Sequence, residues 1–188
     1  SGRNEGTVSV GKQSVGIYAA GAGAYVVNNN GIINVGEEST GIFLSDGIRA
    51  ENLGTAEING TGNKAVGIYS ENTAAGAVQI TNDNKIDLAG EQSIGIYASG
   101  NHNISNTGNI LIGNSSDPDQ PGVGIYQDGI AGSISNTGNI NAGDNSIGIY
   151  NINGTVTNSG SVTAGNGGTG IYTNGGTLNL NSGSSIAV

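Results

Sequence analysis

The chain has 188 residues, of which 35% are hydrophobic, 4% are aromatic and 36 are glycine. Its 14 acidic residues outnumber the 5 basic ones, which gives a net charge of −9 at pH 7, and no lysine or arginine follows Lys85. This charge pattern argues against nucleic acid or an anionic membrane as a partner. Because cysteine is absent, disulfides, thiolate metal sites and redox thiols are excluded.

Two short motifs recur along the chain with one shared period of about 25 residues. A period of this length is typical of an array of equal structural units, so both motifs are interpreted first as architecture. The first motif is Gly-Ile-Tyr, once Gly-Ile-Phe, and its aromatic residues are Tyr18, Phe43, Tyr69, Tyr97, Tyr126, Tyr150 and Tyr172. The second motif is Asn-x-Gly, once Asn-x-Asn, and its asparagines are Asn4, Asn29, Asn52, Asn82, Asn106, Asn136, Asn158 and Asn181.

The first predicted strand of each repeat follows the Asn-x-Gly motif, where apolar and polar residues alternate. Alternation with period two predicts a half-buried strand. An eighth copy, Ile186/Val188, is shifted by one residue. The apolar pairs of the other copies are Val8/Val10, Ile33/Val35, Ala56/Ile58, Ile86/Leu88, Ile110/Ile112, Ile140/Ala142 and Val162/Ala164.

The Gly-Ile-Tyr motif lies in a second predicted strand, typified by residues 93–97. We expect its β-branched residues to face the core, because the isoleucine recurs in every copy. The glycine and the ring would then share the outer face, with the rings lying over glycine backbone. The opposite orientation, with the rings inside, stays open. A third strand, such as residues 103–106 or 133–136, leads directly into the next Asn-x-Gly motif.

Three short strands per repeat, without helical periodicity, predict an all-β fold. We expect a right-handed, single-stranded parallel β-helix of about seven to eight coils. A left-handed form would need a strict hexapeptide repeat, and a calcium β-roll would need Gly-Gly-x-Gly-x-Asp nonapeptides; the sequence shows neither. At about 4.8 Å per coil, residues 1–188 would form one rod roughly 36 Å long.

The recurring polar and aromatic positions are expected to stack from coil to coil. Each asparagine would hydrogen-bond its local backbone and the asparagines above and below it, as a structural ladder. The glycine of each motif, or Asn84 where glycine is missing, fits a left-handed backbone position. The rings would form a second structural ladder, and a platform for stacking carbohydrate is the alternative.

Few residues in the sequence suggest catalysis. Gly-Ile-Tyr also occurs in GIY-YIG nucleases, but their Tyr-Ile-Gly motif is absent here. The single histidine, His102, is expected on a surface loop. Glu57 and Asp87 take the same position after their Asn-x-Gly motifs, so they should point outward from adjacent coils, like the carboxylate pair of a glycan-cleaving enzyme. Lys64 and Lys85 are close in sequence to these two carboxylates, so a solvated face of mixed charge is an equally natural interpretation. No catalytic residue, metal site or cofactor is predicted.

The repeat departs most from its mean length between Gly113 and Gly122, in a segment that contains both prolines. A loop that protrudes from a regular scaffold is a candidate recognition site, and a tolerated insertion is the alternative. The acidic residues Asp46, Glu71 and Asp128, just after the aromatic strands, are expected to line one longitudinal edge. The candidate recognition residues are Asn114, Asp117, Pro118, Asp119, Gln120 and Pro121.

Successive coils carry Asn-x-Gly-x-[Ile/Val]-x-x-Gly followed by Ser-x-Gly-Ile-Tyr, nearly from end to end of the chain. In this style of repeat the chain resembles passenger segments of large fusobacterial outer-membrane autotransporters, the RadD type of adhesin. The chain departs from the pattern at Phe43, Ala65, Asn84, Gly122 and Gly168.

This resemblance implies that residues 1–188 are one segment of a longer passenger domain at the cell surface. A signal peptide would precede it, and an outer-membrane β-barrel beyond its C-terminus would be the sole membrane attachment. The implied function is attachment to other bacteria or host cells through a surface protein or glycan. A glycan-binding or glycan-cleaving β-helix is the alternative function. As an isolated segment the chain is expected to be monomeric, with strand edges at residues 6–10 and 177–188 that fray or pack end to end.

Overall fold

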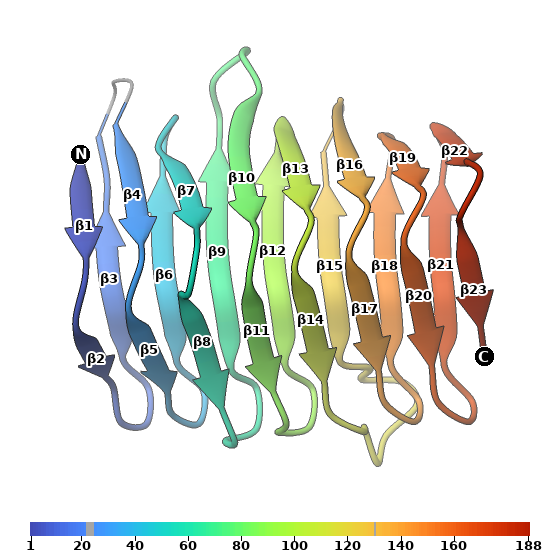
Figure 1. The fold of residues 1–188 in the computed structure, drawn as a ribbon, viewed down its shortest axis with the longest axis horizontal. Helices are drawn as coiled ribbons and strands as arrows, with labels where there is room; N and C mark the ends of the chain where they lie inside the picture. The colour runs from blue at the N-terminus through green and yellow to red at the C-terminus, as the bar shows by residue number, and fades with distance from the viewer. Residues whose placement is uncertain (22–24, 130) are drawn as a thin grey trace.

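The computed structural model describes residues 1–21, 25–129 and 131–188, and this part of the chain is all β. It contains no helix that could span a membrane. The strands form three sheets, A, B and C, and each coil contributes one strand to each sheet (Figure 1).

Sheet A contains the strands that end at the Asn-x-Gly motifs: β1 (Gly2–Asn4), β4 (Val26–Asn29), β7 (Arg49–Asn52), β10 (Val78–Asn82), β13 (His102–Asn106), β16 (Gly132–Asn136), β19 (Thr155–Asn158) and β22 (Thr177–Leu180). Sheet B contains the strands that follow these motifs: β2 (Thr7–Ser9), β5 (Ile32–Val35), β8 (Glu57–Gly60), β11 (Lys85–Leu88), β14 (Asn109–Ile112), β17 (Asn139–Ala142), β20 (Ser161–Ala164) and β23 (Ser185–Ala187). Sheet C contains the Gly-Ile-Tyr strands: β3 (Val15–Ala19), β6 (Thr40–Ser45), β9 (Val66–Asn72), β12 (Ile94–Gly100), β15 (Val123–Asp128), β18 (Ile147–Ile152) and β21 (Thr169–Asn174).

Every strand is parallel to its equivalent in the neighbouring coil. Ile104 of β13 pairs with Ile134 of β16, and Tyr97 of β12 pairs with Tyr126 of β15. The coils therefore stack in sequence order from one end of the rod to the other (Figure 1). The prediction of a parallel β-helix with three short strands per coil is confirmed, with about seven turns.

The core is a column of aliphatic side chains from all three sheets. It forms because each short strand alternates, so that every second residue points into the coil. The core residues at most 1% exposed include Ile80, Ile104, Ile134 and Val156 from sheet A, Ile58, Ile86, Ile110 and Ile140 from sheet B, and Ile68, Ile96, Ile125 and Ile149 from sheet C. The Gly-Ile-Tyr isoleucine thus faces inward, as expected from the sequence.

The Gly-Ile-Tyr glycine also lies on the inner side, so the expectation that it shares the outer face with the ring is wrong. In β12 both Gly95 and Ile96 are buried, which breaks the period of two at the glycine. A Cβ added to Gly95 would lie 2.8 Å from Cγ2 of the core residue Ile110 and 2.6 Å from the Gly124 carbonyl oxygen. The glycine therefore makes room for the sheet B isoleucine of the next coil.

The left-handed backbone positions also differ from those expected. Of the Asn-x-Gly glycines, all within the described residues, just Gly54 and Gly183 have positive φ, and Asn84 does not. Close backbone approach instead requires glycine at Gly31, Gly108, Gly138 and Gly160. A Cβ on Gly138 would lie 2.6 Å from the Thr107 carbonyl carbon, whereas a Cβ on Gly6 would meet nothing within 4 Å. Left-handed residues instead recur at the turn between sheets B and C, with φ of 52–57° at Gln13, Glu38, Lys64, Gln92 and Asn145.

Candidate functional site

A ladder of asparagine side chains runs along the inside of the rod at the bend between sheets A and B. Each Nδ2 donates to the Oδ1 of the asparagine in the next coil, over 2.7–2.8 Å. The residues joined in this way are Asn4, Asn29, Asn52, Asn82, Asn106, Asn136 and Asn158, and all but Asn4 are fully buried.

Several ladder asparagines also bind the turn that follows them. Asn106 Nδ2 donates to the Gly108 carbonyl oxygen over 3.3 Å, and Asn158 Nδ2 to the Gly160 carbonyl oxygen over 3.1 Å. Buried amides need such partners, because an unpaired buried polar group loses its hydration without compensation. The amides are thus used inside the fold and are not presented to a ligand.

The eighth predicted ladder residue, Asn181, is not part of the ladder. Leu180 occupies the position in register with Asn158, and Asn158 Nδ2 donates instead to Ser184 Oγ over 2.7 Å. Asn181 lies one residue beyond this position and is exposed. The sequence signals this offset through the one-residue shift of the Ile186/Val188 pair. Ile186 still pairs with Val162, so the motif before it is displaced by one residue from the ladder position.

The seven aromatic rings form a second ladder on the outside of sheet C. Successive ring centroids are 4.7–5.5 Å apart, and the ring planes are within 4–30° of parallel. The internal rings keep part of their surface accessible, and the end rings Tyr18 and Tyr172 are 65% and 41% exposed. The rings therefore lie outside the core, which resolves the orientation that the sequence left open.

The stacking leaves only the edges of the internal rings accessible, together with the hydroxyl groups of the tyrosines among them, because each ring face contacts another ring. A sugar stacks on the face of an aromatic ring, and along this ladder those faces are already occupied. An outward-facing ring face remains only at each end of the stack, at Tyr18 and Tyr172. The geometry thus gives the carbohydrate platform no specific support along the length of the rod.

Acidic side chains lie beside the ring ladder. Glu71 and Asp128 are each in register with Ser99, so they stand in one column two residues beyond the rings. Tyr69 Oη donates to Glu71 Oε1 over 2.6 Å, and burial together with this bond raises the pKa of Tyr69 above its usual value. Asp46 lies on the same edge, where its Oδ1 accepts from Thr73 Oγ1 over 2.9 Å.

The predicted carboxylate pair on sheet B is out of register. Glu57 lies opposite Lys85, and Asp87 lies opposite Asn59, so the two carboxylates are not direct neighbours. Lys85 Nζ lies 3.8 Å from Glu57 Oε2 and 3.2 Å from Asp87 Oδ2. The structure thus shows the mixed-charge face, and Lys85 stands where a glycosidase would need free space between its carboxylates.

The candidate recognition loop is ordered by its own hydrogen bonds. Asp117 accepts from the Asp119 backbone N–H and from Gln120 Nε2, both over 2.9 Å. Ser115 is buried, and its hydroxyl donates to the Gln120 carbonyl oxygen over 2.8 Å. Asn114 Oδ1 accepts from the Asp144 backbone N–H, which ties the loop to the next coil.

The loop presents its remaining predicted residues to solvent. Pro118, Asp119 and Gln120 are exposed, while Pro121 is half-buried where the chain returns to β15. The loop protrudes at the lower edge of the rod in Figure 1, between β14 and β15. Among the described residues, no group of three or more His, Asp or Glu side chains could hold a metal ion.

His102 is at the start of β13 and fully buried, so its expected place on a surface loop is wrong. Its Nε2 lies 2.9 Å from Ser70 Oγ, which is also buried. A serine and a histidine at this distance can act as nucleophile and base, but this pair lies inside the core, where no substrate can reach it. His102 lies two residues before Ile104 and four before Asn106, which both point inward. The alternation of side chains along a strand therefore indicates that His102 also points inward.

Sequence reasoning also missed the buried amides Gln127 and Asn151. Both directly follow a ring residue in sheet C, at the position that is apolar in β3 and β6. The facing positions in the following sheet A segments are Gly132 and Gly154. A Cβ on Gly154 would lie 2.8 Å from Asn151 Oδ1, so the long amides fill the space that these glycines leave.

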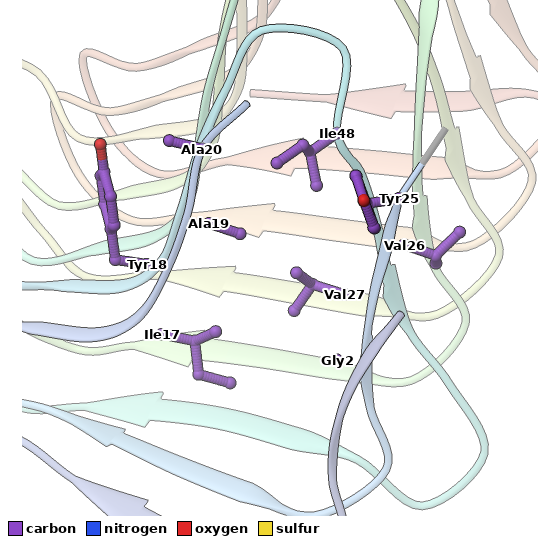
Figure 2. Close-up of a pocket in the computed structure, with 9 residues that line it drawn as sticks. All are labelled: Gly2, Ile17, Tyr18, Ala19, Ala20, Tyr25, Val26, Val27 and Ile48. Atoms are coloured by element: carbon purple, nitrogen blue, oxygen red, sulfur yellow. The ribbon is translucent and has the colours of Figure 1, made fainter. Parts of the chain in front are cut away.

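Two hollows stand out in the part of the chain that the structure describes. One, of about 470 Å³, opens at the N-terminal end of the rod, where Ile17, Ala19, Val27 and Ile48 converge and Tyr18 points away (Figure 2). It is the uncovered end of the apolar core. The other, of about 500 Å³, lies on the edge where sheet C strands lead into sheet A, and Gly100 and Asn101 contribute to its lining.

The ladders, the loop and the hollows thus give no constellation that identifies a reaction. Comparisons of the chain with protein-family models, with curated proteins and with solved structures each found no match.

Proposed function

We propose that this chain is a structural and adhesive segment of a cell-surface autotransporter passenger. In this role the rod is a rigid stalk, and its loops attach to other bacteria or to host cells through a surface protein or glycan. The repeat style supports the passenger assignment by resemblance.

The observation that carries the proposal is the unbroken register of the three parallel sheets. Each coil adds one strand to every sheet, and the asparagine and aromatic ladders cross the same coil boundaries. Bending the rod between two coils would break backbone bonds, amide bonds and ring contacts together. A rod of this kind resists bending even though it has few charged residues and no disulfides.

The adhesive part of the proposal rests on the loop at residues 114–121. Most other turns between sheets B and C are short and similar to one another, so they offer a partner little that is distinctive. This loop alone among the described B-to-C connections contains proline, and its fold is fixed by Ser115 and Asp117. A preorganised protruding loop lowers the entropy lost on binding.

Attachment of coated beads to bacterial and host cells tests this function. The intact chain is compared with a variant in which residues 114–122 are replaced by the sequence Asp-Asn-Ser of the equivalent turn at residues 144–146. A control variant shortens the loop at residues 73–77 instead. We expect beads with the intact chain and the control to attach, and beads with the replaced loop to lose attachment while circular dichroism stays unchanged.

Two outcomes would overturn separate parts of the proposal. Equal attachment of all three proteins, or none by any, would remove the adhesive role from this loop. Small-angle scattering that shows a flexible chain in place of a rod would remove the stalk role.

A further inference from the structure

The central coils contain a buried polar corner, defined here as Ser70, His102, Gln127 and Asn151. These residues belong to strands on either side of the bends where sheet C leads into sheet A. In Figure 1 these bends form the upper edge of the rod. All four are at most 1% exposed. In the first two coils the equivalent sheet C positions are the apolar Ala19 and Leu44, which shows that the polar residues replace ordinary core.

The hydrogen bonds of this corner are incomplete. Gln127 Nε2 donates to the His102 carbonyl oxygen over 3.3 Å, and Asn151 Nδ2 to the Gly154 carbonyl oxygen over 3.2 Å. Within the described chain, His102 Nδ1, Gln127 Oε1 and Asn151 Oδ1 have no hydrogen-bond partner. The corner is therefore held less firmly than the asparagine ladder at the next bend.

No carboxylate in the described chain faces the His102 ring. Val78 and Gly132 flank it in sheet A, and Ser70 contacts it from sheet C. The acidic residues nearest in the packed strands, Glu71 of β9 and Asp128 of β15, alternate to the outer face and are exposed. A positive charge on His102 would thus be buried without a counter-ion.

We propose that this polar corner is an acid-sensitive weak point of the rod, where protonation of His102 opens the C-to-A bend of the central coils while the coils on either side stay folded. The weak point is independent of the proposed adhesive function, because it depends on buried residues alone. Opening of this corner would let the rod, which is rigid at neutral pH, bend near its middle in an acidic environment.

The direction of the pH dependence follows from burial. Burial lowers the pKa of His102 below its ordinary value of 6.5, and the nearby Gly100 backbone opposes part of this shift. The closed corner therefore keeps His102 neutral, and its stability is complete above pH 6.5. As the pH falls below 6.5, the open corner takes up a proton that the closed one does not, so opening becomes about tenfold more favourable per pH unit until the lowered pKa is reached.

Hydrogen exchange of the whole chain at pH 7.5 and 5.5, corrected for intrinsic rates, tests the proposal. Three proteins are compared: the natural chain, His102→Gln and His102→Val. The glutamine can still hydrogen-bond Ser70, and the valine matches Val78, the residue of β10 that pairs with His102. We expect protection of β12, β13 and β16 in the natural chain to fall about tenfold at pH 5.5. Protection of β5 and β20 should stay constant, and neither variant should show the acid effect.

The same acid loss in His102→Gln as in the natural chain would overturn the proposal, and so would a loss spread evenly over all coils. His102 is the only histidine in the sequence, so its ring resonances can be followed without assignment. A native pKa at or above 6.5 would also overturn it.

Discussion

At the scale of single residues, the asparagine ladder shows how one side chain can stabilise three coils. Asn106 accepts from Asn82 over 2.7 Å, and it donates to Asn136 over 2.7 Å and to the Gly108 carbonyl oxygen over 3.3 Å. Its burial removes water as a competing partner, so each of these groups depends on the others.

Replacing Asn106 with alanine is expected to destabilise the chain by about 1–3 kcal/mol, because the Asn82 and Asn136 amides each lose a buried partner. Asn181→Ala is the matched control, since Asn181 follows the same motif but lies outside the ladder. It should change stability by less than about 0.5 kcal/mol. Urea denaturation followed by circular dichroism measures both, and equal effects would contradict the ladder's role.

The same residues show what the sequence could predict at this scale. The motif identified seven ladder asparagines, because a side chain that bonds to its own copy must recur at one position. It misplaced Asn181, because the register depends on the packing of Leu180 and Ile186, which motif matching ignores. His102 was misplaced for a different reason. A polar residue type suggests the surface, whereas the alternation of β13 places His102 on the inner face.

At the scale of strands, the three-strand coil followed from period-two alternation, but the contacts between sheets did not. The Gly-Ile-Tyr glycine breaks the alternation, and its role is visible only once sheet B packs against sheet C. The register of β8 was also mispredicted. The turn in which the Ala56 N–H donates to the Leu53 carbonyl oxygen adds residues before this strand, so Ile58 rather than Ala56 pairs with Ile86.

The packing role of the glycine gives a prediction for sheet C. Gly95→Ala is expected to destabilise the chain by about 1–3 kcal/mol, because the new methyl group overlaps Ile110 and the Gly124 carbonyl oxygen. Gly76→Ala is the control, since a Cβ there meets nothing within 4 Å. Thermal unfolding of the two variants should separate them clearly, and a Gly95 variant as stable as the control would show that the glycine is not needed for this contact.

At the scale of the whole molecule, the rod is a sum of nearest-neighbour contacts between coils. Its two ends expose apolar residues, such as Tyr18 and Val15 at one end and Leu180 and Val188 at the other. Fraying or end-to-end packing at residues 6–10 and 177–188 stays a prediction. The binding partner could not be predicted from the repeats, because the residues that recur in every coil stabilise the fold. A specific ligand must be recognised by the residues that differ from coil to coil.

Disulfide formation between engineered cysteines tests the stacked register of the coils directly, because the natural chain contains no cysteine. Ser105 and Ser135 are direct partners on the outer face of sheet A, whereas Ser105 and Ser133 are offset by two residues. Parallel partners lie within the range of Cα separations that a disulfide allows, and the offset pair lies outside it. We predict that Ser105→Cys with Ser135→Cys forms an intramolecular disulfide on mild oxidation, and that Ser105→Cys with Ser133→Cys does not. Faster or equal cross-linking of the offset pair would contradict the stacked register on which the ladders depend.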